Sequence, residues 1–203
     1  MNKYTIEIIA VSYQQTKELK VFVQCVLNQT HDNWKLKVLH DGPSTEFEEL
    51  MSAYKAQQPE KIFYNCTSKR YKDYGHSLRE QALEEVTGDY VLLTNGDNYL
   101  IPKYVEYLNE ALNSHHPDVV IYNMVHAHRN PGGRPQLSHC FFDVEYRPMC
   151  IDMGAAIVRS DLAKKAGFTD KTHDGDQTYF RKIAELKPDL RVAKVPRVLF
   201  VHN

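Results

Sequence analysis

The sequence predicts an α/β fold in which helices cover both faces of a mainly parallel sheet. The chief observation is that β-rich apolar runs alternate with segments whose apolar residues recur at helical spacing. The connections between these segments are short, which is typical of successive strand–helix–strand units. With 203 residues, 42% of them hydrophobic, the chain suits one sizeable core. We therefore expect a single domain over residues 1–203.

The first elements follow from the pattern near the N-terminus. Tyr4–Tyr13 is an apolar, β-rich run, and Thr16–Thr30 places its apolar residues on one helical face. A second apolar run, Trp34–Gly42, closes with Asp-Gly, which is a turn signal. These segments predict a strand, a helix and a second strand.

The next unit begins with capping residues. Within Ser44–Gln58, Thr45 stands three residues before Glu48, which is the spacing of a capping box. The segment therefore predicts a helix with Thr45 at its N-cap. The short run Lys61–Cys66 then predicts a third strand.

The remaining elements of the sheet repeat this alternation. His76–Val86 predicts a helix that Gly88 ends, and Tyr90–Asn95 predicts a fourth strand. Pro102–Ser114 predicts a helix with a proline at its first position, where proline is favoured. Asp118–His128 predicts a fifth strand, so the alternation continues beyond the middle of the chain.

Composition and charge exclude several classes of protein. The net charge of −1 provides no basic field for nucleic acid. No apolar run approaches the roughly 20 residues of a membrane span, and no signal-peptide pattern opens the sequence. The cysteines are widely spaced and predict reduced thiols in a cytoplasmic protein rather than disulfides or a zinc site. They are Cys25, Cys66, Cys140 and Cys150.

Polar and aromatic residues follow three of the predicted strands. Ser12 and Tyr13 end the first strand, Asp41 follows the second, and Asn95–Asn98 follows the fourth. Ligands of open α/β sheets bind at the carboxyl ends of the strands, so these residues mark a candidate site. No glycine-rich phosphate loop follows any strand, which excludes the dinucleotide-binding and P-loop patterns. A divalent metal on a carboxylate is the remaining way to hold a phosphate here.

Several motifs occur in an order that resembles a known family. The sequence contains "VSYQQ", "NQTHDNW", "VLHDGPS" and the long stretch "YGHSLREQALEEVTGDYVLLTNGDNYLIP" between Tyr4 and Leu112. Weaker matches follow in "MGAAIVRSDLAKKAGF", "HDGDQTYFRKI" and the terminal "VLFVHN". Together these motifs resemble the inverting nucleotide-sugar glycosyltransferases of the GT-A fold, known as glycosyltransferase family 2.

The resemblance implies a fold, an activity and a division of the chain. It implies a Rossmann-like GT-A domain in which residues 1–112 bind the nucleotide sugar and residues 113–203 bind the acceptor. The implied reaction transfers a sugar, with inversion, from a nucleotide-sugar donor to a hydroxyl of a glycan, glycoprotein or lipid-linked acceptor. The expected donor is a UDP-sugar.

The resemblance also implies a metal site. In this family an Asp-x-Asp element ends the fourth strand, and one carboxylate binds Mn²⁺ or Mg²⁺. Here the first acidic position is Asn95, which supplies no charge but can hydrogen-bond a ribose hydroxyl, and the second is Asp97. His202 matches a position that often carries a second metal ligand, and Mn²⁺ accepts imidazole better than Mg²⁺ does. The alternatives are that Asn-Gly-Asp-Asn is simply a turn and that His202 is only a terminal residue.

Residues for the nucleotide follow from the same resemblance. Tyr13 is expected to stack on the base, and Asp41 is expected to accept the N3–H of uracil. Arg79 matches a basic position that reaches the base or the phosphates. Ser12 is expected to contribute its backbone, and Gly96 lies in the same nucleotide-binding turn. The alternatives are a strand-end aromatic residue, an Asp-Gly turn and a solvated helix arginine.

A catalytic base is implied at the start of a late helix, in "THDGDQTYFRKIAEL". Asp174 and Asp176 are both candidates to take the proton from the acceptor hydroxyl, and Asp176 is favoured because we place it immediately before the helix. The alternative is that Asp176 is only the N-cap of that helix.

The acceptor side is the least informative part of the sequence. His126–Gly154 is long, irregular and rich in Gly and Pro, which is typical of a binding loop or lid. Asp152 is expected to face the transferred sugar. The histidines of this region have an irregular setting, so we interpret them as chance rather than a metal cluster; they are His126, His128 and His139.

Two other functions are compatible with such a sheet. A pyrophosphorylase-like enzyme needs a glycine-rich N-terminal nucleotide loop, whereas this chain has "AVSYQQTKE". A catalytically weak or inactive GT-A domain could serve as a nucleotide-sugar binding or assembly module, and the loss of the first aspartate is the feature that favours it.

Overall fold

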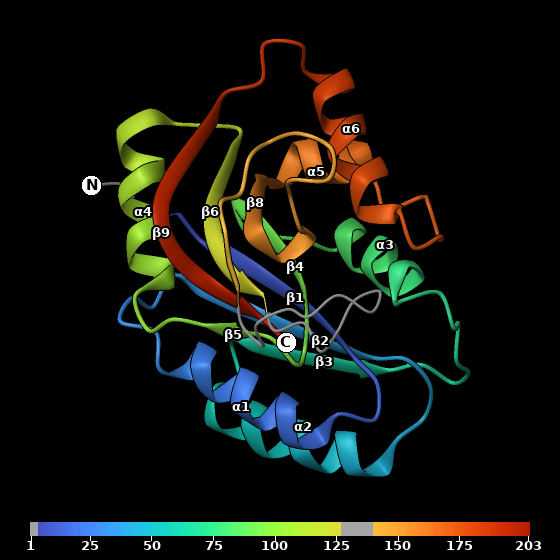
Figure 1. Ribbon diagram of the computed structural model, residues 1–203. Helices are drawn as coiled ribbons and strands as arrows, with labels where there is room; N and C mark the ends of the chain where they lie inside the picture. Colours follow the sequence, from blue (N-terminus) through green and yellow to red (C-terminus); the bar gives the residue numbers. More distant parts are fainter. Residues whose placement is uncertain (1–3, 127–139) are drawn as a thin grey trace.

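A mixed β-sheet with helices on both sides forms the centre of the computed structural model, which describes residues 4–126 and 140–203 (Figure 1). The strands are β1 (Ile6–Ser12), β2 (Trp34–His40), β3 (Ile62–Cys66), β4 (Tyr90–Asn95), β5 (Tyr99–Leu100), β6 (Val119–His126), β7 (Cys140–Phe142), β8 (Ala156–Arg159) and β9 (Val192–His202). The helices are α1 (Thr16–Leu27), α2 (Thr45–Gln57), α3 (His76–Glu84), α4 (Tyr104–His115), α5 (Ser160–Ala166), α6 (Gly175–Leu186) and the 3-10 turn η2 (Met153–Ala155).

The strands follow the order β3-β2-β1-β4-β8-β6-β9-β5, with β7 paired to β6. The longest ladders are parallel and join β1 to β2, β1 to β4 and β6 to β9. Pairs that include β5, β7 or β8 are antiparallel. The predicted α/β fold with a mixed, mainly parallel sheet is therefore confirmed.

The helices divide between the two faces of the sheet as the short crossovers require. Figure 1 shows α1 and α2 together on one side, whereas α3, α5 and α6 gather on the other. All seven residues of β1 are buried, because β1 lies between two parallel neighbours and beneath helices on both faces. None of the described helices has the length and apolar composition needed to span a membrane.

Three expectations about helix starts are wrong. Ser44, not Thr45, is the N-cap of α2, because its extended backbone lets its hydroxyl accept the N–H of Phe47 at 3.2 Å. Pro102 lies two residues before α4 rather than at its first position. Asp174, not Asp176, occupies the N-cap of α6, and Asp176 lies in the first turn of that helix.

The last strand, β9, pairs with a short strand from the first half of the chain. The chain leaves β4, turns at Asn95–Asn98 and forms β5, which pairs with β9 rather than with β4. Tyr99 pairs with Val201, and the N–H of Asn203 donates to the side-chain oxygen of Asn98 at 3.2 Å. The C-terminal residues therefore lie beside the carboxyl end of β4 (Figure 1).

Candidate active site

Two adjoining cavities lie at the carboxyl edge of the sheet. The first, which we call the strand-end cleft, has a volume of about 540 Å³ and is lined by Ser12, Tyr13, Asp41, Arg70, Asn95 and Asp97, among others. The second, which we call the acidic pocket, has a volume of about 400 Å³ and is lined by Arg79, His126, Asp152, Asp174, Asp176 and His202, among others. Tyr74 and Asn95 line both cavities, so the two form one continuous site.

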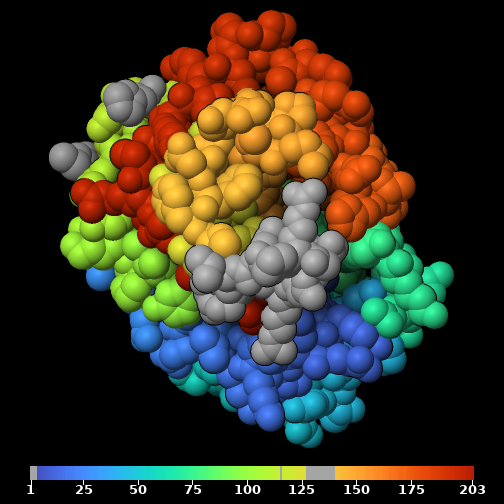
Figure 2. All heavy atoms as spheres, in the orientation of Figure 1, coloured from blue at the N-terminus to red at the C-terminus, as the bar shows by residue number. Residues whose placement is uncertain are grey.

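The site joins residues from both halves of the chain. In Figure 2 the N-terminal part of the chain lies at the bottom of the face, while the C-terminal part lies at the top and right. Among the described residues, those that line the strand-end cleft fall within 11–97, whereas the acidic pocket combines α3 and β4 with His126 and residues of 149–202.

Asp41 is buried at the end of β2 and organises the segment that follows β3. Its Oδ1 accepts the N–H of Tyr71 at 2.7 Å, and its Oδ2 accepts the N–H of Lys72 at 3.3 Å. Arg70 Nε lies 3.5 Å from the same Oδ2. Because carboxylates hold backbone donors firmly, Asp41 fixes the wall of the strand-end cleft as well as facing it.

Tyr13 lies in the strand-end cleft with one face of its ring covered. The guanidinium carbon of Arg70 lies 3.4 Å from the ring centroid, which is a cation–π contact. The backbone beyond Arg70 is strained, since Lys72 and Tyr74 both have a φ of 60°. Sequence reasoning missed Arg70. The available signal was an arginine in the loop between β3 and α3, the helix that Gly75 caps.

Ser12 lines this cleft, and Gly96 lies between two of its lining residues, Asn95 and Asp97. The carbonyl of Ser12 accepts the N–H of Asp41 at 3.0 Å, so the backbone of Ser12 ties β1 to β2. Gly96 is buried, and its N–H donates to the carbonyl of Val11 at 2.8 Å. A Cβ on Gly96 would lie 3.0 Å from Leu19 Cδ1, so the turn after β4 packs too closely for a side chain.

Asp97 has one satisfied and one unsatisfied oxygen. Gln15 Nε2 donates to Oδ2 at 2.9 Å, whereas Oδ1 is buried and has no hydrogen-bond partner in residues 4–126 and 140–203. A buried carboxylate oxygen without a donor is costly unless a cation or water satisfies it. Asp97 therefore fits the role of a metal ligand.

His202 lines the acidic pocket. The register of β5 and β9 places it next to the turn that carries Asp97. Its Nε2 is 3.9 Å from Asp152 Oδ2, and its ring stacks on that of His126 with centroids 4.2 Å apart. Within the described part of the chain, no group of three or more His, Cys, Asp or Glu side chains is arranged to hold a metal. His128 and His139 lie outside the described residues.

Arg79 is 1% exposed and lies beneath the end of β4, so the alternative of a solvated helix arginine is wrong. It donates to the side-chain oxygen of Asn95, to the carbonyl of Tyr74 at 2.7 Å and to that of Thr94 at 3.4 Å. Burial lowers the pKa of Arg79 to about 10, while nearby carboxylates, Asp152 first among them, act in the opposite direction. The guanidinium is therefore a buried positive charge at neutral pH.

His76 connects Arg79 to the loop before α6. Its Nδ1 lies 3.1 Å from Arg79 Nη1, and its Nε2 lies 3.0 Å from the carbonyl of Thr172. Because arginine is only a donor and a carbonyl only an acceptor, Nε2 carries the proton. Burial, followed by the charge of Arg79, lowers the pKa of His76 to about 4. Sequence reasoning missed His76, although its spacing of three from Arg79 places both on one helix face.

Gly175 allows α6 to begin against α3. A Cβ on Gly175 would lie 2.7 Å from the carbonyl oxygen of Asp170 and 2.9 Å from His76 Nε2, closer than real Cβ atoms come. The absence of a side chain at this position therefore sets how deeply the start of α6 enters the site.

The two candidate bases differ in their surroundings. Asp174 exposes 81% of its side chain and lies 3.4 Å from His173 Nδ1. Asp176 is half-buried in the acidic pocket, and desolvation, together with the charge of Asp152, raises its pKa. Asp152 lines the same pocket and caps η2 by accepting the N–H of Gly154 at 2.7 Å. The burial of Asp176 in the acidic pocket is the feature that favours it over Asp174 as the candidate base.

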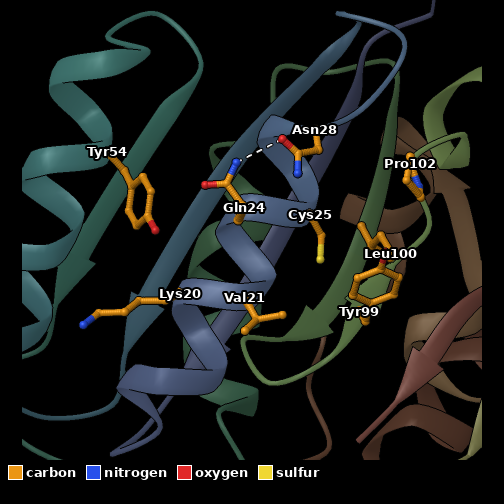
Figure 3. Close-up of a pocket in the computed structure, with 9 residues that line it drawn as sticks. All are labelled: Lys20, Val21, Gln24, Cys25, Asn28, Tyr54, Tyr99, Leu100 and Pro102. Carbon is orange, nitrogen blue, oxygen red and sulfur yellow. Dashed lines mark hydrogen bonds between the residues drawn. The ribbon is translucent and has the colours of Figure 1, made fainter.

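A further hollow of about 440 Å³ lies between α1, α2 and β5 (Figure 3). Figure 3 shows Lys20, Val21, Tyr54 and Tyr99 around it, with a hydrogen bond of 3.0 Å between Gln24 and Asn28. Among the described residues its lining contains no carboxylate and no histidine.

Comparisons with known proteins agree with this geometry. A family model described as Glycosyl transferase family 2 matches residues 7–180. No curated protein sequence matches the chain.

Solved structures share the fold at low sequence identity. Staphylococcus aureus TarS 1-349 is 16% identical with a TM-score of 0.77, over 98% of this chain and 60% of that chain. The same TarS fragment in complex with UDP-GlcNAc gives 16% and 0.76, over 97% and 58%. The Pyrobaculum calidifontis mannosyltransferase PcManGT, in complex with GDP-Man and Mn²⁺, gives 14% and 0.71, over 99% and 57%.

The chain thus spans about three-fifths of the length of these structural relatives. At such identities the likeness shows the fold, while the family match extends over most of the chain. This chain therefore belongs to glycosyl transferase family 2 and has the GT-A fold.

Proposed function

We propose that the chain transfers a sugar from a UDP-sugar to an acceptor hydroxyl in a metal-dependent, inverting reaction. The observation that carries this proposal is the unsatisfied, buried Oδ1 of Asp97 at the edge of two adjoining cavities. One cavity has the volume and polar lining for a nucleoside diphosphate, and the other holds the candidate base. A TarS structure contains UDP-GlcNAc, which supports a nucleotide-sugar donor of this class.

Residues 1–112 supply the nucleotide site in this proposal. Asp41 has lone pairs left for the N3–H of uracil, and Tyr13 offers a ring for stacking. If uracil stacks on the face that Arg70 covers, Arg70 moves off the ring, and its cation then lies near the incoming diphosphate. In this proposal Ser12 and Gly96 lie beside the bound nucleotide.

A divalent cation completes the donor site in this proposal. Asp97 provides the charged oxygen ligand, and His202 is the second protein ligand. This mixed donor set suits Mn²⁺, and PcManGT contains Mn²⁺ together with its nucleotide sugar. When bound, the cation would neutralise charge on the departing nucleoside diphosphate.

Residues 113–203 supply the base and the acceptor site. We propose that Asp176 takes the proton of the acceptor hydroxyl as that oxygen attacks the sugar, and that Asp152 faces the sugar. Desolvation, together with the charge of Asp152, raises the pKa of Asp176, which strengthens it as a base. A single displacement of this kind inverts the anomeric centre.

A titration of UDP and GDP into the protein, with Mn²⁺ or with EDTA, tests the proposal. We expect tighter binding of UDP than of GDP, and a strong gain with Mn²⁺ that Asp97→Asn removes. Asp32→Asn is the matched control, since Asp32 exposes 93% of its side chain. Mn²⁺-independent UDP binding that Asp97→Asn leaves unchanged would contradict the metal assignment, and preference for GDP would contradict the choice of uracil.

A turnover assay separates an enzyme from a binding module. The replacement of the first aspartate by Asn95 is the observation that favours a binding module. Release of UDP from UDP-sugars in the presence of Mn²⁺ supports the enzyme, and binding without any release supports the module.

A further inference from the structure

Asn95 stands where the family's Asp-x-Asp element has its first carboxylate, and the structure fixes the direction of its amide. The side-chain oxygen of Asn95 accepts a hydrogen bond from Arg79 Nη2. The other end of the amide, Nδ2, has no hydrogen-bond partner in the part of the chain that the structure describes. Asn95 lines both the strand-end cleft and the acidic pocket, so this NH₂ group lies at their junction.

The side-chain amide of Asn95 cannot flip without losing its hydrogen bond from Arg79. Arg79 has donors and no acceptor, so a reversed amide would place its NH₂ against another donor. Arg79 itself is held by the carbonyl of Tyr74 and by His76 Nδ1, and its burial leaves it no room to turn away. His76 is tied in turn to the carbonyl of Thr172. The NH₂ of Asn95 is therefore a preset donor that faces the ligand site.

The positive charge next to this donor favours an anion, while Asp97, Asp152 and Asp176 act against one. Arg79 places a buried positive charge directly behind Asn95, with Asn95 between that charge and the cleft. Asp97, two residues on, carries the only negative charge of the Asn-Gly-Asp-Asn turn. An aspartate at position 95 would add a second negative charge and remove the donor, so it would repel a phosphate that no cation screens.

We propose that the Asn95 amide nitrogen donates a hydrogen bond to the diphosphate of the bound nucleotide, and that donor binding therefore has a component that needs no divalent cation. This inference rests on the proposed function, because it takes a nucleoside diphosphate as the ligand. It assigns Arg79 and His76 as positioning residues that act through Asn95.

Calorimetric titrations of UDP and of uridine, in EDTA and in saturating Mn²⁺, test this proposal. The variants are Asn95→Asp, which exchanges the donor for a charge, and Asn95→Leu, which removes the donor together with the oxygen that accepts from Arg79. Gln57→Glu is the control, because it adds the same negative charge at an exposed position of α2.

We expect the wild-type chain to bind UDP in EDTA, and both Asn95 variants to bind it there about tenfold or more weakly, as for the loss of a hydrogen bond to a charged group. Mn²⁺ should restore UDP affinity to Asn95→Asp, which gains a carboxylate ligand, more than to Asn95→Leu. Uridine affinity should not change in either variant, since uridine has no phosphate. Gln57→Glu should match the wild type throughout.

Each other outcome overturns part of this assignment. If the wild-type chain binds UDP only with Mn²⁺, or if both variants bind UDP normally in EDTA, the inference is wrong and the proposed function stands. If uridine affinity falls as much as UDP affinity, the contact is to the nucleoside and the inference is again wrong. Absence of UDP binding in every buffer removes the proposed function as well. Circular dichroism melts check that each variant is folded. If Asn95→Asp is unfolded, the titrations of Asn95→Leu decide the outcome.

Discussion

Asp41 and Asp176 are two carboxylates of one site, and their surroundings differ. Asp41, at the end of β2, accepts two backbone N–H groups and lies beside Arg70. Asp176, in the first turn of α6, accepts the N–H of Gln177 at 2.7 Å and lies near Asp152 in the acidic pocket. Asp41 therefore holds donors of the loop that follows β3, whereas desolvation and the charge of Asp152 act on Asp176.

The difference indicates that Asp41 supports the structure of the site, while Asp176 is suited to proton transfer. The oxygens of Asp41 hold the backbone of the loop that carries Tyr71 and Lys72. A carboxylate that is half-buried, beside another carboxylate, has its pKa raised and gains basicity. We therefore expect substitution of Asp176 to affect turnover, and substitution of Asp41 to affect the fold.

The largest expected effect is on turnover of the Asp176→Asn variant. Transfer, followed as UDP released from the donor with an acceptor present, should fall by about 10²–10⁴-fold, because a positioned base is lost. Thermal stability should be unchanged or slightly higher. Since the folded state raises the pKa of Asp176, it favours the protonated form, and a neutral amide removes that cost above the raised pKa.

Asp174→Asn is the matched control for this prediction, because Asp174 is one helical position outside α6 and is exposed. It should retain most of the activity. If Asp174→Asn loses transfer and Asp176→Asn retains it, the base is Asp174. An anomeric configuration that is retained in the product, as determined by NMR, would exclude the single displacement in either case.

The next effect in size concerns stability of the Asp41→Asn variant. An amide offers one oxygen and places an NH₂ group against a backbone donor, so about 1–3 kcal/mol of unfolding free energy should be lost. Urea unfolding monitored by fluorescence measures this loss, and Asp32→Asn should show none. A variant that binds UDP poorly but unfolds like the wild type would show that Asp41 serves the ligand alone.

A further effect is a pH dependence of stability that comes from His76. Its pKa is about 4 in the folded chain against an ordinary value of 6.5, so the unfolded chain binds the proton first as pH falls. The stabilisation is complete above pH 6.5 and is lost as pH falls toward 4, with a slope of about 1.4 kcal/mol per pH unit. His76→Gln should flatten this part of the profile in urea titrations between pH 4 and 7.

The reference for this measurement is His173→Gln, at a histidine that exposes 85% of its side chain. Other groups near His76 also titrate, Asp73 among them, so the difference between variant and wild type is the quantity of interest. Equal slopes in His76→Gln and the wild type would show that His76 is not the group that titrates.

The strand-end cleft could be predicted from the sequence because it depends on local pattern. Apolar runs mark β1, β2 and β4, and parallel strands bring their carboxyl ends to one edge, so Tyr13, Asp41 and Asp97 meet there. The helix caps were less predictable, since Ser44 and Thr45 are equally good cap residues and only the backbone conformation decides between them.

The acidic pocket depends on contacts between distant segments, which the sequence pattern does not encode. Arginine is usually a surface residue. Arg79 can be buried because the carbonyls of Tyr74 and Thr94 accept hydrogen bonds from its guanidinium. His76 meets Thr172, 96 residues further along the chain, only because Gly175 permits the approach. For the same reason the family resemblance named a region for the base but did not distinguish Asp176 from Asp174.

The place of β5 in the sheet has a consequence for how the chain is made. During translation β5 emerges directly after β4, but its partner β9 is synthesised only after β6 and β8. Until then the turn at Asn95–Asn98 has no strand to hold it, and the nascent chain carries an incomplete edge. Contacts that join such distant segments form late and slow folding. We therefore expect the edge that carries Asp97 to be the last part of the site to mature, after strands β1–β4 have been synthesised.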